Sequence, residues 1–123
     1  MLVDASTAPT FELPFLRVTG LAAPSRGAAA TCVWRLTLAP GAPGAEHTLD
    51  KEEIFVALAG RATATVAGRV MTLRAGDALI VPAGTPFSLG NPGPEPFEAV
   101  AVLPVGAEAR LPGGECLTPP WTL

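Results

Sequence analysis

The sequence predicts an all-β fold, built as a single antiparallel barrel of short strands. Apolar and polar residues alternate with a two-residue period in several short stretches, the clearest at residues 29–38. Turns rich in glycine and proline separate these stretches, and the 123-residue chain holds 13 Gly and 14 Pro. No segment combines a sustained helical period with a cap at each end. These observations favour a barrel or sandwich of the jelly-roll type.

The N-terminal part begins with an arm and a poorly defined first strand. Residues 1 to about 12 contain Ser6, Thr7 and Pro9, which interrupt any regular pattern. Residues 11–18 predict a strand that Pro14 confines to an edge or a bend. Residues 20–28 predict a loop.

The central part predicts most of the sheet. Along residues 29–38, Cys32, Trp34, Leu36 and Leu38 share one face. The residues Val33, Arg35 and Thr37 share the other. Further strands are expected at residues 53–59, 61–66, 69–73, 78–81, 87–90 and 97–103. The pair Ala67-Gly68 predicts a tight hairpin between two of them.

The C-terminal tail, from about residue 104 to residue 123, is predicted to be irregular because it contains Pro112, Pro119 and Pro120. Its apolar residues Leu117, Trp121 and Leu123 are expected to pin it against the barrel or a partner subunit. Residues 1–123 therefore predict one domain, with no internal repeat.

Charge and hydropathy exclude some partners and favour another. A net charge of -3, with scattered lysines and arginines, argues against nucleic acid and gives no reason to expect a membrane surface. The mean hydropathy is +0.40, which is high for a small domain with little interior to hide apolar surface. We therefore expect a homodimer.

Two cysteines, Cys32 and Cys116, lie far apart in the sequence. The first residues lack the basic start and apolar core of a signal peptide, so we expect a cytoplasmic protein with reduced, partly buried thiols. The longest uncharged run, at residues 78–94, is broken by four prolines and is not a membrane span.

Two blocks of residues carry the functional information. The first contains Gly41, His47, Glu53 and Gly60, and the second contains Gly76, Pro82, Gly84 and Asn91. Together they resemble the two motifs of the cupin superfamily, over roughly the middle half of the chain. The resemblance implies a small single-domain cupin barrel.

The resemblance also implies where a divalent metal would bind and why this chain departs from the pattern. Cupins bind the metal through three histidines and a glutamate. Here His47 and Glu53 match two of those positions, while Leu49 and Phe87 stand at the other two. Since a catalytic metal normally takes at least three protein ligands, we expect no tightly held metal and no other cofactor; a divalent ion would have only His47 and Glu53.

The remaining cavity is expected to bind a small organic molecule. Leu49, Phe87 and Phe55 would shape an apolar pocket, with His47 and Glu53 as polar contacts or as catalytic groups. Phe55 is included because it shares a strand face with Glu53. Arg35 is a further candidate, for binding an anionic group, although an exposed position on the barrel wall is the more common place for an arginine.

Three functional interpretations stay open on the sequence alone. The first is a binding protein without turnover. The second is an enzyme, either a metal-free isomerase or epimerase that uses His47 and Glu53 as an acid–base pair, or a weakly metal-dependent one. The third is a structural cupin with a vestigial site, in which His47 and Glu53 only satisfy each other by hydrogen bonding.

Overall fold

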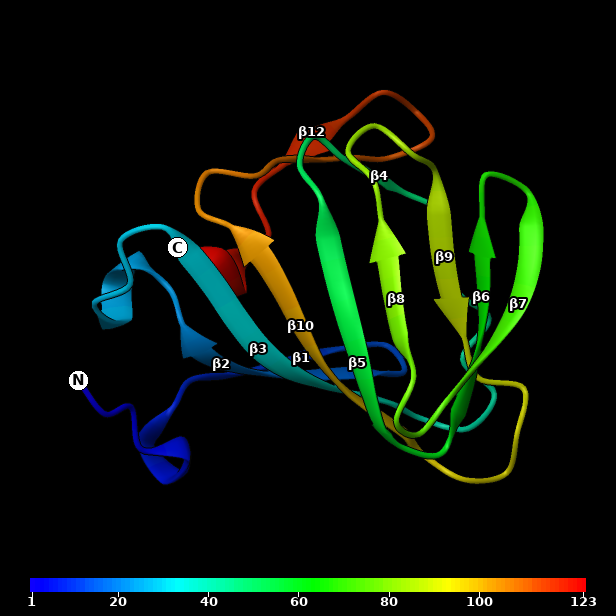
Figure 1. Cartoon of the computed structure of the whole chain (residues 1–123), viewed down its shortest axis with the longest axis horizontal. Helices are drawn as coiled ribbons and strands as arrows, with labels where there is room; N and C mark the ends of the chain where they lie inside the picture. The colour runs from blue at the N-terminus through cyan, green and yellow to red at the C-terminus, as the bar shows by residue number, and fades with distance from the viewer.

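The computed structural model describes residues 1–123, and it is almost entirely β-structure (Figure 1). Twelve strands and three short 3₁₀ helices follow one another along the chain. Their bounds are η1 Ala5–Thr7, β1 Thr10–Leu13, β2 Leu16–Ala22, η2 Pro24–Arg26, β3 Thr31–Leu38, β4 Thr48–Leu49, β5 Glu53–Ala59, β6 Arg61–Val66, β7 Arg69–Arg74, β8 Ala78–Val81, β9 Phe87–Gly90, β10 Phe97–Pro104, β11 Ala109–Arg110, β12 Cys116–Leu117 and η3 Pro120–Thr122. The prediction of an all-β fold is confirmed.

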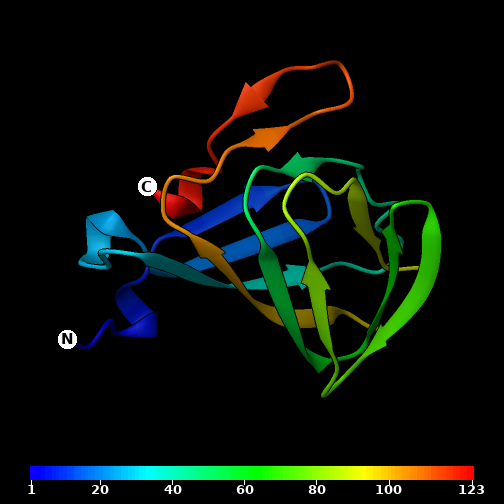
Figure 2. The ribbon, with the colours of Figure 1, turned by 45° about the horizontal axis from the view of Figure 1, so that its top comes forward.

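The strands form three antiparallel sheets. The largest has the order β1-β2-β3-β10-β5-β8, and two three-stranded sheets have the orders β7-β6-β9 and β12-β11-β4. Figure 2 shows the six-stranded sheet curving toward the β7-β6-β9 sheet, with β11 and β12 across one end. The sheets thus form the jelly-roll type of barrel predicted from the sequence, but they do not close into one continuous sheet.

The core forms where the two-residue period turns apolar side chains inward. On β3 the residues Cys32, Trp34, Leu36 and Leu38 are buried and their neighbours are more exposed, as predicted. The central strand β10 pairs with β3 on one side and β5 on the other, and it buries Phe97 and Leu103 among others. One cluster of 22 buried apolar residues results.

Two turns show why the predicted hairpins form. Ala67 and Gly68 both have positive φ, 50° and 78°, which gives the two-residue turn between β6 and β7 the twist that antiparallel strands require. Gly60, between β5 and β6, has a φ of 71°. A Cβ there would collide with the carbonyl oxygen of Pro96, so only glycine fits.

Both ends of the chain are more regular than predicted. The expected strand at residues 11–18 is a hairpin, in which Pro14 and Phe15 join β1 to β2, and β2 runs on to Ala22 within the expected loop. The tail contains β11, β12 and η3, because its backbone pairs with β4 and its last residues bond to η2. Cys32 is buried as a small core residue, whereas Cys116 is exposed, contrary to the expected partial burial.

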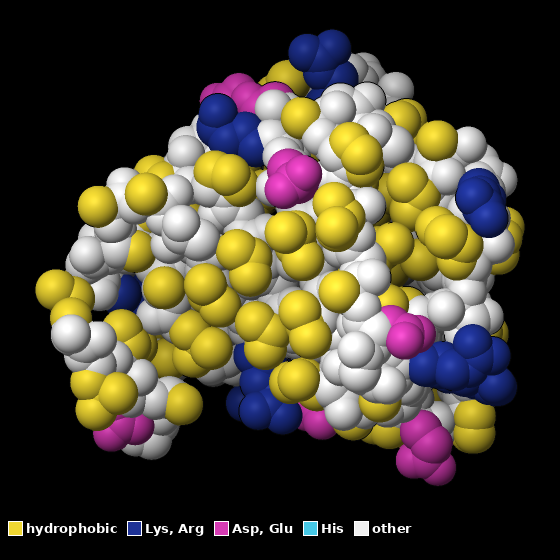
Figure 3. Space-filling model, in the orientation of Figure 1, with side chains coloured by type: hydrophobic (Ala, Val, Ile, Leu, Met, Phe, Trp, Pro, Cys, Tyr) yellow, Lys and Arg dark blue, Asp and Glu magenta, His cyan; other side chains and the backbone are white.

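The outer face of the large sheet is apolar over β5 and β8. Val56, Leu58 and Ile80 are exposed there, on β5 and β8. Figure 3 shows hydrophobic side chains spread over the face where β10, β5 and β8 lie in Figure 1. The expected homodimer stays a prediction. No helix has the length and hydrophobicity needed to cross a membrane.

Candidate functional site

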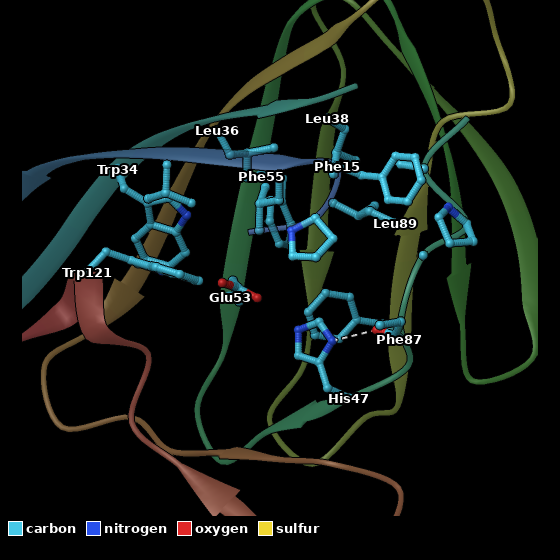
Figure 4. A pocket seen from close by; sticks show the side chains of 17 residues that line it. Phe15, Trp34, Leu36, Leu38, His47, Glu53, Phe55, Phe87, Leu89 and Trp121 are labelled. Atoms are coloured by element: carbon cyan, nitrogen blue, oxygen red, sulfur yellow. Dashed lines mark hydrogen bonds between the residues drawn. The ribbon is translucent and has the colours of Figure 1, made fainter. Parts of the chain in front are cut away.

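A cavity of about 410 Å³ opens between the six-stranded sheet and the segment that precedes β4 (Figure 4). Twelve of its 17 lining residues are hydrophobic, and no lysine or arginine is among them. The lining residues are Pro14, Phe15, Leu16, Val18, Trp34, Leu36, Leu38, Ala42, Pro43, Gly44, Ala45, His47, Glu53, Phe55, Phe87, Leu89 and Trp121. A cavity of this size and character suits a small organic ligand.

Strand alternation places the cavity-lining side chains of the large sheet. Trp34, Leu36 and Leu38 point inward from β3, and Glu53 and Phe55 point inward from β5. Glu53 is the first residue of β5, and its backbone is paired with that of Val81 on β8. Its carboxyl is therefore carried by a rigid strand. The sequence therefore fixes an acidic group on an otherwise apolar wall.

Glu53 is buried without a counter-charge. Its residue is 4% exposed, and its Oε1 atom has no hydrogen-bond partner. Burial raises the pKa of this carboxyl to about 8, because an ionised carboxylate loses its hydration in an apolar environment. Glu53 is therefore mainly protonated at neutral pH and can donate a hydrogen bond.

His47 is held by two neighbours. Its backbone forms a bridge to Phe87, with N–H to O distances of 3.0 and 2.9 Å, and the two rings lie with centroids 4.4 Å apart. Its Nδ1 atom lies 2.9 Å from the carbonyl oxygen of Ala45. Because a carbonyl oxygen only accepts, Nδ1 carries the proton, and Nε2 of the neutral ring is left as an acceptor.

The expected hydrogen bond between His47 and Glu53 is absent. The side-chain partner of His47 is Ala45, and Oε1 of Glu53 has none. The physical reason is that both residues face the same open cavity, where each polar group lies against apolar walls instead of against the other (Figure 4). The vestigial-site interpretation requires a hydrogen bond between these two side chains, and the structure does not contain it.

The residues present do not fit the divalent metal that the fold implies. No group of three His, Cys, Asp or Glu side chains is close enough together to hold an ion. Phe87 fills one expected ligand position with a ring that contacts both His47 and Phe55. One carboxyl and a single imidazole form too small a donor set for a resident cation.

The structure brings together four of the six predicted site residues. His47, Glu53, Phe55 and Phe87 all line the cavity. Leu49 is buried in the core but does not line the cavity, since β4 pairs there with β11 from the C-terminal tail.

Arg35 also lies outside the cavity, so the expectation that it contacts a ligand needs correction. It alternates to the outer face of β3, where its side chain is 51% exposed and pairs with Glu98 at 3.3 Å. The cavity therefore offers no lysine or arginine to an anionic ligand.

Sequence reasoning missed one aromatic end of the cavity. Trp121 of η3 packs against Trp34 and Phe11, with ring centroids 6.1 and 6.0 Å apart, and Arg26 donates a hydrogen bond to its carbonyl oxygen. Its indole Nε1 is buried and has no hydrogen-bond partner. The available signal was a tryptophan in a proline-rich tail. It indicated that the tail is anchored, but it did not identify the residues that anchor it.

The β1–β2 turn supplies a further lining residue that was missed. Phe15 is half exposed at this turn and has a φ of 64°, a conformation that bulky residues rarely adopt. No sequence pattern marks such a residue, since glycine is the usual occupant.

The comparisons with known proteins agree with this architecture. Residues 34–103 match the family model of the cupin domain, Cupin_2. No curated protein matches the sequence. Many solved structures share the fold at low sequence identity.

Three of these structures show the range. The polyketide cyclase RemF from Streptomyces resistomycificus is 16% identical with a TM-score of 0.76, covering 85% of this chain and 78% of its own. A sugar phosphate isomerase of the cupin superfamily from Silicibacter pomeroyi is 15% identical with a TM-score of 0.75, covering 90% and 81%. A predicted oxalate decarboxylase from Thermotoga maritima is 22% identical with a TM-score of 0.68, covering 85% and 98%. At these identities the likeness shows the fold alone.

Proposed function

We propose that this protein, which belongs to the cupin domain family, binds a small organic molecule in its apolar cavity, with Glu53 and His47 as the polar contacts. The ligand is held directly by protein side chains and needs no resident metal, since the chain supplies only two of the usual donor positions.

The observation that carries the proposal is the unpaired carboxyl of Glu53 inside the cavity. A buried polar group without a partner costs free energy, and a ligand that bonds to it is one physical explanation for its presence in a folded protein. A ligand oxygen that accepts a hydrogen bond from the protonated Glu53 carboxyl would remove that cost. The recovered free energy contributes to the affinity for the ligand, so the group that destabilises the ligand-free protein stabilises the complex.

A second candidate function is metal-free acid–base catalysis on the same ligand. The observation that favours it is the pair of opposite proton states: Glu53 carries a proton, and Nε2 of His47 can accept one. In such a reaction Nε2 takes a proton from the carbon beside a carbonyl, while Glu53 gives its proton to the carbonyl oxygen. On a substrate with a hydroxyl on that carbon, His47 then returns a proton to the former carbonyl carbon while the ionised Glu53 takes the proton of that hydroxyl, which becomes the new carbonyl oxygen and completes an isomerisation.

Thermal unfolding with added small carbonyl compounds and sugars tests binding. A binder present at a hundred times its Kd should stabilise the wild-type protein by about 3 kcal/mol. The variants His47→Ala and Glu53→Leu should fold and lose this stabilisation. Val70→Ala, at an exposed site of β7, is the control and should retain it.

The results separate the interpretations. If hits stabilise Glu53→Leu and His47→Ala as much as the wild type, the proposed site is wrong. If His47→Ala unfolds without any ligand present and no compound stabilises the wild type, the structural interpretation replaces binding. Deuterium incorporation from heavy water beside the ligand carbonyl, followed by NMR, distinguishes turnover from binding alone.

A further inference from the structure

The chain concentrates its aromatic side chains around the cavity. It has five Phe, two Trp and no Tyr. Five of these seven residues line the cavity: Phe15, Trp34, Phe55, Phe87 and Trp121. The only histidine lines it as well. A core that merely needed filling could use the aliphatic residues that dominate the rest of this protein.

The rings form two groups with the acid between them. Trp34 and Trp121 lie at one end, at 6.1 Å, and Phe87 contacts His47 and Phe55 at the other, at 4.4 and 5.8 Å. Figure 4 shows Glu53 between the tryptophan pair and the His47–Phe87 pair. The ring planes within these pairs are tilted by 50°, 49° and 59°, and aromatic rings that line a cavity can make offset or edge-on contact with a further ring.

The charge of the lining excludes anions. No lysine or arginine reaches the cavity, and Arg35 is engaged with Glu98 outside it. Ring faces carry negative partial charge and repel an anion further. A phosphate or carboxylate would meet no guanidinium or ammonium group in this cavity and would lose hydration at a large cost.

The polar atoms without partners define the ligand's functional group. The Trp121 indole N–H can only donate, and both this group and Oε1 of Glu53 are buried without a hydrogen-bond partner in residues that line the cavity. The indole N–H therefore needs an acceptor, and a carbonyl oxygen with its two lone pairs is a suitable one on the ligand.

We infer that the ligand is an uncharged, planar aromatic molecule that carries a carbonyl oxygen, stacked between the two aromatic groups of the cavity. This inference rests on the proposed function and names the ligand class of that same site. Uncharged aromatic ketones fit better than sugars, which have no apolar face of comparable extent, and better than phosphorylated or carboxylated compounds.

Four probes of similar size separate the elements of this inference. 2-Acetylnaphthalene has all the required features. 2-Naphthoate adds a negative charge, the trimethyl(2-naphthyl)ammonium ion adds a positive one, and 2-acetyldecalin keeps the ketone but has no aromatic ring. Equilibrium binding is followed by quenching of the fluorescence of Trp34 and Trp121, or by calorimetry for the non-absorbing ketone.

The expected order follows from the cavity. 2-Acetyldecalin should bind about 3- to 10-fold more weakly than 2-acetylnaphthalene, because stacking against the rings is lost. 2-Naphthoate should bind at least about 100-fold more weakly, since its charge loses hydration in a cavity that has no lysine or arginine. The ammonium ion should also bind more weakly than the ketone, because it offers no acceptor to the unpaired Trp121 N–H.

Two variants distinguish a binding role from a packing role. Phe87→Leu removes a ring that lines the cavity, and Phe97→Leu removes a fully buried ring that does not. Both should destabilise the fold, but only Phe87→Leu should narrow the ratio of affinities for the aromatic and saturated ketones. The ratio in Phe97→Leu should match the wild type.

Each outcome decides the inference. It is overturned if the saturated ketone, 2-naphthoate or the ammonium ion binds as tightly as 2-acetylnaphthalene, or if Phe97→Leu narrows the ratio as much as Phe87→Leu. If the saturated ketone binds equally well and Glu53→Leu abolishes its binding, the ligand class fails while the proposed function stands. If none of the four binds the folded protein, the inference fails, and the wider compound panel then decides the proposed function.

Discussion

The buried carboxyl of Glu53 should make the stability of this protein fall as the pH rises from weakly acidic to weakly basic. The pKa of this group is about 8 in the folded chain against an ordinary value of 4.5, and burial is the cause. His47 is the only other titratable side chain that lines the cavity. Below pH 4.5 Glu53 is protonated in both states and contributes no pH dependence. Between 4.5 and 8 the unfolded chain loses this proton first, so unfolding becomes progressively more favourable.

The size of the effect follows from the two pKa values. Each unit of difference corresponds to about 1.4 kcal/mol, so the folded state is destabilised by about 3 kcal/mol at pH 7 and by about 5 kcal/mol above pH 8. With an exposure of only 4%, Glu53 has little solvent to reduce this cost. The substitution Glu53→Gln keeps the shape and the hydrogen-bonding ability of the side chain and removes the titration.

Urea unfolding followed by tryptophan fluorescence measures the effect at several pH values between 5 and 8.5. The stability of Glu53→Gln relative to the wild type should increase over this range by several kcal/mol, on the order of the full shift. Other titrating groups cancel in this difference. Glu52→Gln, an exposed neighbour, is the matched control and should track the wild type. The difference in free energy of unfolding between Glu53→Gln and the wild type could instead stay constant to within about 1 kcal/mol over this pH range. That result would refute a neutral, buried Glu53.

Two further predictions concern the loops that frame the cavity. Asn91→Ala should lower the free energy of unfolding by about 2–4 kcal/mol, because this fully buried side chain donates to the carbonyl oxygens of Leu38 and Glu95 at 3.1 and 2.8 Å and accepts from a backbone N–H. Asp77→Ala, at an exposed turn, is the control and should lower it by less than about 1 kcal/mol in the same denaturant assay. An equal loss of stability in both variants would contradict the argument. Phe15→Gly should be more stable than Phe15→Ala by about 1 kcal/mol, because both lose the ring while only alanine keeps an unfavourable φ of 64°. Thermal unfolding of the two variants checks this, and alanine proving equal or better would show that the backbone at this turn is not strained.

The strands were predictable where local pattern and burial agree. β3 and β5 alternate cleanly, and one face of each covers the core, so their sequences state both the strand and its orientation. β4, β11 and β12 are two residues long and carry no period to read. The hairpin of β1 and β2 was missed for a different reason, since its turn uses Phe15 in a conformation normally left to glycine.

The site was predictable only in part, because sequence motifs identify the residues at one end of the cavity and tertiary contacts alone place those at the other. His47 and Glu53 stand in motifs whose spacing is visible in the chain. Trp121 reaches the cavity through tertiary contacts: Arg26 holds its carbonyl oxygen, and Trp34 packs against its ring. Such contacts between segments far apart in sequence leave no local signature.

The replacement of two motif positions by Leu49 and Phe87 changes what Glu53 is. A bound dication would hold a carboxylate in its ionised form and use it as a ligand. With apolar groups in those positions, no positive charge opposes the cost of burying the carboxylate, and the proton returns. The acid then becomes a hydrogen-bond donor in a cavity lined by aromatic rings. Under the proposed function, the apolar residues at the two motif positions and the neutral carboxyl are thus parts of one electrostatic change, which suits the cavity to an uncharged hydrogen-bond acceptor.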